Sequence, residues 1–191
     1  MKKQVTVAII VAAGQGSRMG KNHNKLLLPL GTRTILEFSL DTFLIHSRIS
    51  KIFLAVSSEI RVNFENHFPE KITMVEGGKR RQDSVHNALL KILQGENIPE
   101  LVLVHDAARP LCSGDLIDRI IDSAINYGAA IPVLPMVDTI RIVSGGKTRI
   151  VDRNKLFSVQ TPQGFKTKII KDASTQALMN NKRNQCLHPL N

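Results

Sequence analysis

A glycine-rich loop with two basic residues follows the first apolar segment of the chain. The segment 5–12 is an apolar run, the loop 14–20 holds three glycines and Arg18, and Lys25 comes shortly after. Glycine lets backbone N–H groups approach a ligand and turn toward it, and a nest of such groups binds phosphate oxygens. Because Arg18 and Lys25 add two positive charges beside this nest, the pattern predicts a nucleoside triphosphate site.

Two known glycine patterns do not match this loop. The P-loop needs four residues between its glycines and then Lys before Ser or Thr. Here Gly16 and Gly20 enclose three residues, and Lys21 is followed by Asn22. The dinucleotide pattern G-x-G-x-x-G needs a third glycine where Met19 stands. A looser dinucleotide site, G-x-G-x-x-x-G, and a plain strand–helix turn remain as alternatives to the triphosphate site.

Apolar runs alternate with amphipathic segments through the first 134 residues. The pattern predicts strands at 5–12, 51–57, 72–76, 101–105 and 129–134, and helices at 34–46, 60–67, 82–93 and 113–127. Strand–helix alternation predicts an α/β fold with a doubly wound, mostly parallel sheet. Ligands of such sheets bind beyond the carboxyl ends of the strands, which is where the glycine loop falls.

The alternation stops after Pro135. Two segments rich in β-branched residues, 138–143 and 148–151, flank Ser144-Gly145-Gly146-Lys147. This pattern predicts a β-hairpin. Because the hairpin does not continue the strand–helix rhythm, we expect it to project from the sheet as an arm.

Composition indicates one soluble domain with a basic surface. The chain has 191 residues, a hydrophobic fraction of 42% and a net charge of +10. The charge fits an electrostatic funnel for anionic substrates, nucleic-acid binding or a generally basic surface. With no Trp and one Tyr for base stacking, we expect no nucleic-acid partner. No apolar run approaches the ~20 residues of a membrane span, so we expect no membrane partner.

Cysteine usage bears on the cellular compartment. Cys112 and Cys186 are too few and too far apart for a disulfide framework or a metal cluster. This favours a reducing, cytoplasmic location.

Several segments of the chain together resemble the motifs of one enzyme family. These segments are residues 12–20 with 24–26, 77–85, 104–110, 151–154 and 161–163. Their order and spacing are similar to those of the 2-C-methyl-D-erythritol 4-phosphate cytidylyltransferases, a family of the nucleotidyltransferase superfamily. The resemblance covers residues 1 to about 175 and implies a Rossmann-like nucleotidyltransferase fold.

The resemblance also implies roles for individual side chains. Charge stabilisation in the transition state is implied for Arg18, Lys25 and Arg153, the last reaching across a dimer. Nucleotide contacts are implied for Ala12, Ala13, Gly14, Gly16, Gly78, Ser84 and Asp106. Acceptor contacts are implied for Arg109, Thr139, Arg153 and Thr161. Mg²⁺ is the implied cofactor, held by the phosphates of CTP or with help from Asp106, which could instead only order the turn 106–109.

The implied reaction transfers CMP from CTP to methylerythritol phosphate in non-mevalonate isoprenoid synthesis and releases pyrophosphate. The resemblance further implies a homodimer joined through an arm at about 136–157. One alternative is a relative that acts on another acceptor, such as a pentitol phosphate. Another is a truncated, non-catalytic nucleotide-binding product, because the family's C-terminal motifs are absent. We expect one domain at 1–178 and an irregular polar tail at 179–191.

Overall fold

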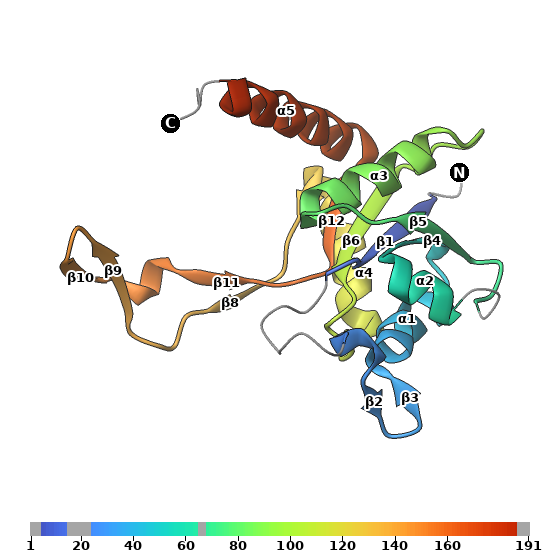
Figure 1. Ribbon diagram of the computed structural model, residues 1–191, viewed down its shortest axis with the longest axis horizontal. Helices are drawn as coiled ribbons and strands as arrows, with labels where there is room; N and C mark the ends of the chain where they lie inside the picture. The colour runs from blue at the N-terminus through green and yellow to red at the C-terminus, as the bar shows by residue number, and fades with distance from the viewer. Residues whose placement is uncertain (1–4, 15–23, 65–67, 187–191) are drawn as a thin grey trace.

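Six strands form the central sheet of this computed structural model, which describes residues 5–14, 24–64 and 68–186. Their order is β5 (Ile72–Glu76), β4 (Ile49–Val56), β1 (Thr6–Ala12), β6 (Leu101–Asp106), β12 (Gln163–Lys166) and β7 (Ala129–Ala130) (Figure 1). The strands β5, β4, β1 and β6 run parallel, and β12 is antiparallel to both of its neighbours. The predicted α/β fold with a mostly parallel sheet is confirmed.

The strand β1 lies inside the sheet and is covered on both faces. Successive side chains of a strand point to opposite faces. Ala8 and Ile10 accordingly enter one hydrophobic cluster, and Val7 and Ile9 enter the other. All four are at most 5% exposed. Burial on both faces explains why this segment is apolar at nearly every position and does not alternate.

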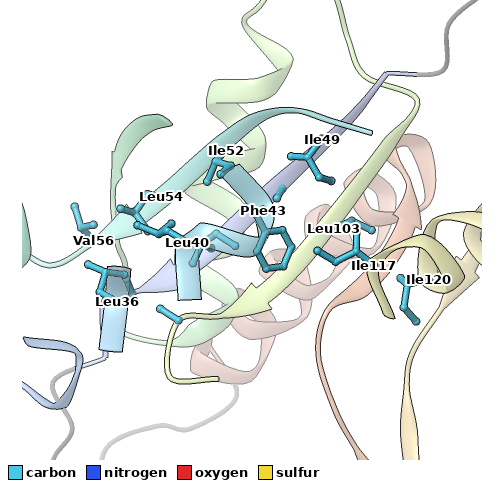
Figure 2. Packing of buried hydrophobic residues seen from close by; sticks show 14 of the residues in the cluster. Leu36, Leu40, Phe43, Ile49, Ile52, Leu54, Val56, Leu103, Ile117 and Ile120 are labelled. Atoms are coloured by element: carbon cyan, nitrogen blue, oxygen red, sulfur yellow. The ribbon is translucent and has the colours of Figure 1, made fainter. Parts of the chain in front are cut away.

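The helices cover the two faces of the sheet. They are α1 (Ile35–Ile45), α2 (Ser58–Phe64), α3 (Arg81–Leu93), α4 (Gly114–Tyr127) and α5 (Thr167–Cys186). The helices α1, α2 and α4 contribute to one cluster, in which Leu36, Leu40 and Phe43 lie close to strand residues (Figure 2). The helices α3 and α5 pack on the other face through Val85 and Ile170. This is the doubly wound arrangement that the sequence predicts.

Side-chain caps fix the starts of two helices. The hydroxyl of Thr34 accepts a hydrogen bond from the amide of Glu37 at 3.3 Å, and the Glu37 carboxylate accepts one from the amide of Thr34 at 2.7 Å. The hydrogen bonds that the Glu37 carboxylate accepts from Thr34 lower the pKa of Glu37. Ser113 caps α4 by accepting from the amide of Leu116 at 3.2 Å. Each cap stabilises its helix by about 1 kcal/mol.

A two-part β-ribbon extends away from the sheet (Figure 1). Its base pairs β8 (Val133–Pro135) with β11 (Phe157–Val159), and its tip pairs β9 (Ile140–Ser144) with β10 (Lys147–Val151). Gly145 and Gly146 close the tip with φ angles of +55° and +73°. Two consecutive positive φ angles match the twist of a two-residue hairpin, and glycine adopts them without strain. The predicted hairpin is therefore present.

Several elements differ from the sequence-based expectation. The predicted strand 129–134 is wrong, because Pro132 separates β7 from β8 and a proline cannot donate a ladder hydrogen bond. The short hairpin of β2 (Pro29–Leu30) and β3 (Arg33–Thr34) was not predicted, nor were β11, β12, α5 and the 3-10 turns η2 (Lys25–Leu27) and η3 (Arg153–Lys155). The helix α5 runs on through residues 179–186, which we expected to be irregular. In the described part of the chain, no helix combines the length and apolar character needed to cross a membrane.

Candidate nucleotide-binding site

A cavity of about 500 Å³ opens at the carboxyl ends of β1 and β6. Six of the residues that the sequence predicts for the site line it: Gly14, Lys25, Gly78, Ser84, Asp106 and Arg109. They come from four segments that are far apart in the sequence. The parallel sheet brings them together because β1 and β6 are adjacent, with Val11 opposite Asp106.

Two glycines near the carboxyl ends of β1 and β5 differ in what surrounds them. A Cβ atom on Gly77, which follows β5, would lie 2.1 Å from the Cβ of Ala13, so that glycine is required by packing within the protein. A Cβ atom on Gly14, which follows β1, would meet no atom of the described residues within 4 Å, and Gly14 lies on the cavity wall. Packing among the described residues therefore gives no reason for glycine at position 14. The open space beside it is suited to a ligand that approaches the backbone closely.

Lys25 is held in place by its neighbours on both sides. It begins η2, and the side chain of Asn24 caps this turn by accepting from the amide of Leu26 at 3.1 Å. The Asn24 amide group also donates to the carboxylate of Glu59 at 3.3 Å. Asn24 and Leu26 are 5% and 2% exposed. The backbone of Lys25 is thus fixed at the cavity while its ammonium group remains available to a ligand.

The start of α3 forms the opposite wall of the cavity. The buried hydroxyl of Ser84 accepts a hydrogen bond from the amide of Gly78 at 2.9 Å, which folds the glycine segment over the first turn of the helix. A Cβ atom on Gly78 would lie 2.3 Å from the Cβ of Asp83. The first turn of a helix presents free N–H groups and the positive end of its dipole, which favours phosphate groups.

Asp106 ends β6 between two arginines. Its carboxylate lies 2.8 Å from Nε of Arg81 and 3.5 Å from Nε of Arg109. Arg81 also donates to the side chain of Gln163 at 3.3 Å. The described residues contain no group of three or more acidic, His or Cys side chains that could hold a metal ion. A single carboxylate fits Mg²⁺, which commonly binds one or two carboxylates together with substrate phosphates.

Three consecutive basic residues at this site were not assigned by the sequence analysis. Lys79, Arg80 and Arg81 all line the cavity. The hydrogen-bonded pair of Arg80 and Asp83 raises the pKa of the guanidinium and lowers the pKa of the carboxyl group. The sequence signal was a run of three cations directly after Gly77-Gly78, next to a predicted helix start. Together with Lys25 they give the cavity a positive surface suited to a polyphosphate.

Thr161 faces the interior of the sheet. It is 7% exposed, and its hydroxyl lies 3.0 Å from Nδ1 of His105. It lines a second, larger cavity of about 870 Å³, whose other walls come mainly from α4 and from the apolar residues around β8. Arg109 lines both cavities, and its guanidinium donates to the side chain of Gln160. The smaller cavity carries the glycines and most of the cations, so we assign the nucleotide to it.

The remaining predicted residues are placed elsewhere. Ala12 and Ala13 lie at the end of β1, where Ala12 is fully buried and Ala13 is half-buried. Thr139 and Arg153 are exposed on the arm, and the Arg153 guanidinium donates to the carbonyl of Val137 at 2.7 Å. Neither of these two lines the cavity with Lys25. The predicted residues Gly16 and Arg18 lie outside the described part of the chain.

Known proteins are similar in sequence to this chain over most of its length. The model of the family "IspD: 2-C-methyl-D-erythritol 4-phosphate cytidylyltransferase" matches residues 6–185. The chain is 36% identical over 175 residues to the 2-C-methyl-D-erythritol 4-phosphate cytidylyltransferase of Bacillus pumilus, which covers 88% of this chain and 75% of that relative. It is 37% identical over 176 residues to the protein of the same name from Geobacillus thermodenitrificans, covering 89% and 75%.

Solved structures share the fold. The crystal structure of 2-C-methyl-D-erythritol 4-phosphate cytidylyltransferase (IspD) from Francisella tularensis matches with a TM-score of 0.79 and 28% identity, covering 95% of this chain and 82% of the other. The structure of the protein of that name from Thermus thermophilus matches with a TM-score of 0.68 and 31% identity, covering 97% and 80%. The glycine-lined basic cavity at the strand ends and these matches agree, and the chain belongs to the IspD family of 2-C-methyl-D-erythritol 4-phosphate cytidylyltransferases.

Proposed function

We propose that this enzyme transfers a cytidylyl group from CTP to the phosphate of 2-C-methyl-D-erythritol 4-phosphate, in the non-mevalonate route to isoprenoid precursors. The observation that carries the proposal is the cavity in which Gly14, Lys25 and the start of α3 face Asp106 and Arg109. Glycine backbone and cations suit the triphosphate, and Arg109 suits the acceptor phosphate at the other end of the cavity. Membership of the family gives the identity of the two substrates.

The chemistry requires charge neutralisation more than proton transfer. A phosphate monoester has a second pKa near 6, so the acceptor is already largely dianionic at neutral pH and needs no general base. One of its oxygens attacks the α-phosphorus of CTP and forms the new P–O bond. The bond from that phosphorus to the bridging oxygen breaks, and pyrophosphate leaves with the electron pair. The proposed role of Lys25, and of Arg18 in the loop before it, is to stabilise the charge that builds up on these oxygens.

Magnesium is part of the proposal. When bound, Mg²⁺ would shield the phosphate charges of CTP and of the leaving group. The proposed protein ligand is Asp106, with the CTP phosphates supplying further oxygens. Its carboxylate pairs with Arg81 in the described protein, so we expect Mg²⁺ and Arg81 to compete for it.

The proposed active form is a homodimer joined through the arm 136–157. Several apolar side chains of the arm are exposed: Val137 at 77%, Val143 at 71% and Ile150 at 62%. Exposed apolar groups that gather on one surface are typical of protein–protein contacts. Because Thr139 and Arg153 lie on the arm and not at the cavity of their own chain, we propose that they reach the acceptor phosphate in the second subunit.

Pyrophosphate release tests the proposed reaction. The purified chain is incubated with CTP and Mg²⁺, with and without methylerythritol phosphate, and with a pentitol phosphate as an acceptor of the same charge. We expect release only with methylerythritol phosphate, and no release when Mg²⁺ is chelated. Release with the pentitol phosphate alone would assign a different acceptor. Binding of CTP without release from any acceptor would support the non-catalytic alternative.

A further inference from the structure

His105 is a fully buried polar residue that directly precedes the turn 106–109, which carries Asp106 and Arg109 of the site. It lies on β6, one residue before Asp106, and its side chain is inaccessible to solvent. Its ring packs against Phe43, with the ring centroids 4.9 Å apart. His105 is thus a strand residue in the layer behind the turn and is not assigned a catalytic role. A buried imidazole that cannot reach a substrate nevertheless carries two nitrogens that need partners.

Both ring nitrogens of His105 have partners around the site. Nε2 lies 3.2 Å from the carbonyl oxygen of Arg109, and Nδ1 lies 3.0 Å from the hydroxyl of Thr161. The same hydroxyl lies 3.3 Å from the backbone amide of Asp106. Full burial of the ring favours its neutral form, because a charged group is costly to remove from water.

One proton arrangement satisfies every member of this group. A carbonyl oxygen only accepts, so Nε2 of His105 carries the hydrogen and donates to Arg109. Nδ1 of the neutral ring then has a free lone pair, and the Thr161 hydroxyl donates to it. The Thr161 oxygen still has lone pairs, and it accepts from the amide of Asp106. A directional chain of hydrogen bonds results, running from Asp106 through Thr161 and His105 to Arg109.

This chain closes the turn that carries the acceptor-side charges. The amide of Arg109 also donates to the carbonyl of Asp106 at 3.0 Å. The turn is therefore held by this backbone bond and by the chain through His105 and Thr161. The side chains of Asp106 and Arg109 both line the nucleotide cavity. Small movements of this turn would displace a guanidinium that must contact phosphate in a defined geometry.

We propose that His105 is a positioning residue for the acceptor phosphate, acting as the Nε2–H tautomer that links Arg109 to Thr161 and so holds the turn 106–109 in its binding geometry. The inference rests on the proposed function, because it takes Arg109 to bind the acceptor. It assigns His105 no contact with either substrate. It differs from a purely structural role in that it predicts an effect on one substrate and not on the other.

Steady-state kinetics of matched variants test the proposal. His105→Phe keeps a ring against Phe43 but removes both nitrogens, and Thr161→Val removes the hydroxyl with little change in shape. We expect each to raise the KM for methylerythritol phosphate about tenfold and the KM for CTP less than about twofold. Because both variants break the same chain of hydrogen bonds, the KM of the double variant for methylerythritol phosphate should be no higher than that of the more impaired single variant. Thr161→Ser, which keeps the hydroxyl, should recover most of the lost affinity.

A second buried threonine provides the control. Thr167 is 6% exposed, and its hydroxyl donates to the carbonyl of Pro99 at 2.6 Å, away from the nucleotide cavity. Thr167→Val therefore makes the same chemical change at a comparable burial, and both KM values should stay within about twofold of the original. Equal rises in the two KM values for Thr161→Val, or a rise of the acceptor KM in Thr167→Val, would overturn the positioning role.

Nitrogen NMR of the unmodified protein gives a readout that does not depend on activity. The ¹⁵N shifts of the six histidines, with His105 assigned by its loss in His105→Phe, report which ring nitrogen carries the proton. We expect the neutral His105 ring to carry its proton at Nε2 at pH 7. A proton at Nδ1, or a charged ring, would refute the hydrogen-bond chain. An unmodified protein that is inactive with methylerythritol phosphate would contradict the proposed function, and the NMR result would then decide the chain alone.

Discussion

The nucleotide cavity and the arm differ in burial and in what holds their side chains in place. The cavity lies on strands that are buried on both faces, and side chains at it are fixed by partners from distant segments, such as Glu59 for Asn24 and Arg81 for Asp106. The arm is a two-stranded ribbon whose apolar side chains are exposed and whose Arg153 bonds to its own ribbon. The sheet therefore preorganises its half of the site within one chain. Side chains of the arm such as Arg141 and Arg153 are held by partners within the ribbon itself.

This difference divides the expected effects of substitutions into two kinds. Changes at the cavity should act within a single subunit and should be independent of assembly. Changes on the arm should act only through the proposed second subunit. The experiments below test whether each substitution acts within one subunit or through the second subunit.

The largest effect is expected at Lys25. Lys25→Ala removes a cation beside the phosphate-binding backbone, and losing a transition-state contact of this kind costs about 3 kcal/mol, or more than about 100-fold in turnover. Arg18→Ala should behave alike. Pyrophosphate release at saturating substrates measures the change. Lys91→Ala, an exposed lysine of α3 that does not line the cavity, is the control and should retain turnover. Near-normal turnover of Lys25→Ala would remove this lysine from the mechanism.

Acid should destabilise the sheet through His105. Its pKa in the folded protein is about 4, below the usual 6.5, mainly because of burial and despite the nearby carboxylate of Asp106; the charges of Arg109 and Arg81 lower it further. The unfolded chain therefore binds the proton first. Stability is complete above pH 6.5 and is lost as pH falls toward 4, by up to about 3 kcal/mol.

Urea unfolding at pH 7 and pH 4.5 checks this pH dependence. His105→Phe has no imidazole to protonate, so its free energy of unfolding should fall less between the two pH values than that of the unmodified protein. Equal falls in the two proteins would show that other groups cause the acid sensitivity. The exposed groups of the arm should contribute little to the difference.

Gly14, which follows β1, and Gly77, which follows β5, should separate binding from folding. Gly77→Ala forces a Cβ atom against Ala13 and should lower the free energy of unfolding by about 1–3 kcal/mol. Gly14→Ala meets no described residue within 4 Å and should leave stability within about 0.5 kcal/mol, while filling space that the proposed nucleotide needs. Thermal unfolding and CTP titration distinguish the two. Undiminished CTP affinity in Gly14→Ala would place the triphosphate elsewhere.

The last experiment mixes two inactive variants and measures the activity that is recovered. Arg153→Ala and Lys25→Ala damage different halves of the proposed shared site. After subunit exchange in equal amounts, half of the dimers are mixed and each has one intact site, so activity should recover to about a quarter of the original. No recovery, with exchange demonstrated by a labelled subunit, would mean that Arg153 acts in its own chain or not at all.

The sequence predicted the parts of the fold that local patterns encode. Apolar runs such as 5–12 identify parallel strands because such strands are buried on both faces. Gly145-Gly146 identifies the hairpin because a two-residue turn needs positive φ angles. The strand β12 is four residues long and contains a glycine and two polar residues, so it has no pattern of its own. It is a strand only because it pairs with β6 and β7.

The site was predictable to a similar degree. Gly14, Gly78 and Lys25 were predicted from their residue types, and the structure places all three at one cavity. The ion pair of Arg81 with Asp106 was missed because it joins residues 25 positions apart through tertiary structure. The orientation of Thr161 was missed for the same reason, since its hydroxyl bonds to His105 on β6, 56 positions away in the sequence.

The pairing of β7 with β12 has a consequence for how the arm can change. Gly164 lies opposite Ala130, so the chain leaves the sheet and returns to it at neighbouring positions. The arm is thus an insertion between two adjacent points of a framework that holds itself together without it. Lengthening or shortening such an insertion changes the loop-closure entropy only slowly. The geometry of assembly can therefore diverge among relatives, or be redesigned, while the catalytic framework stays constant.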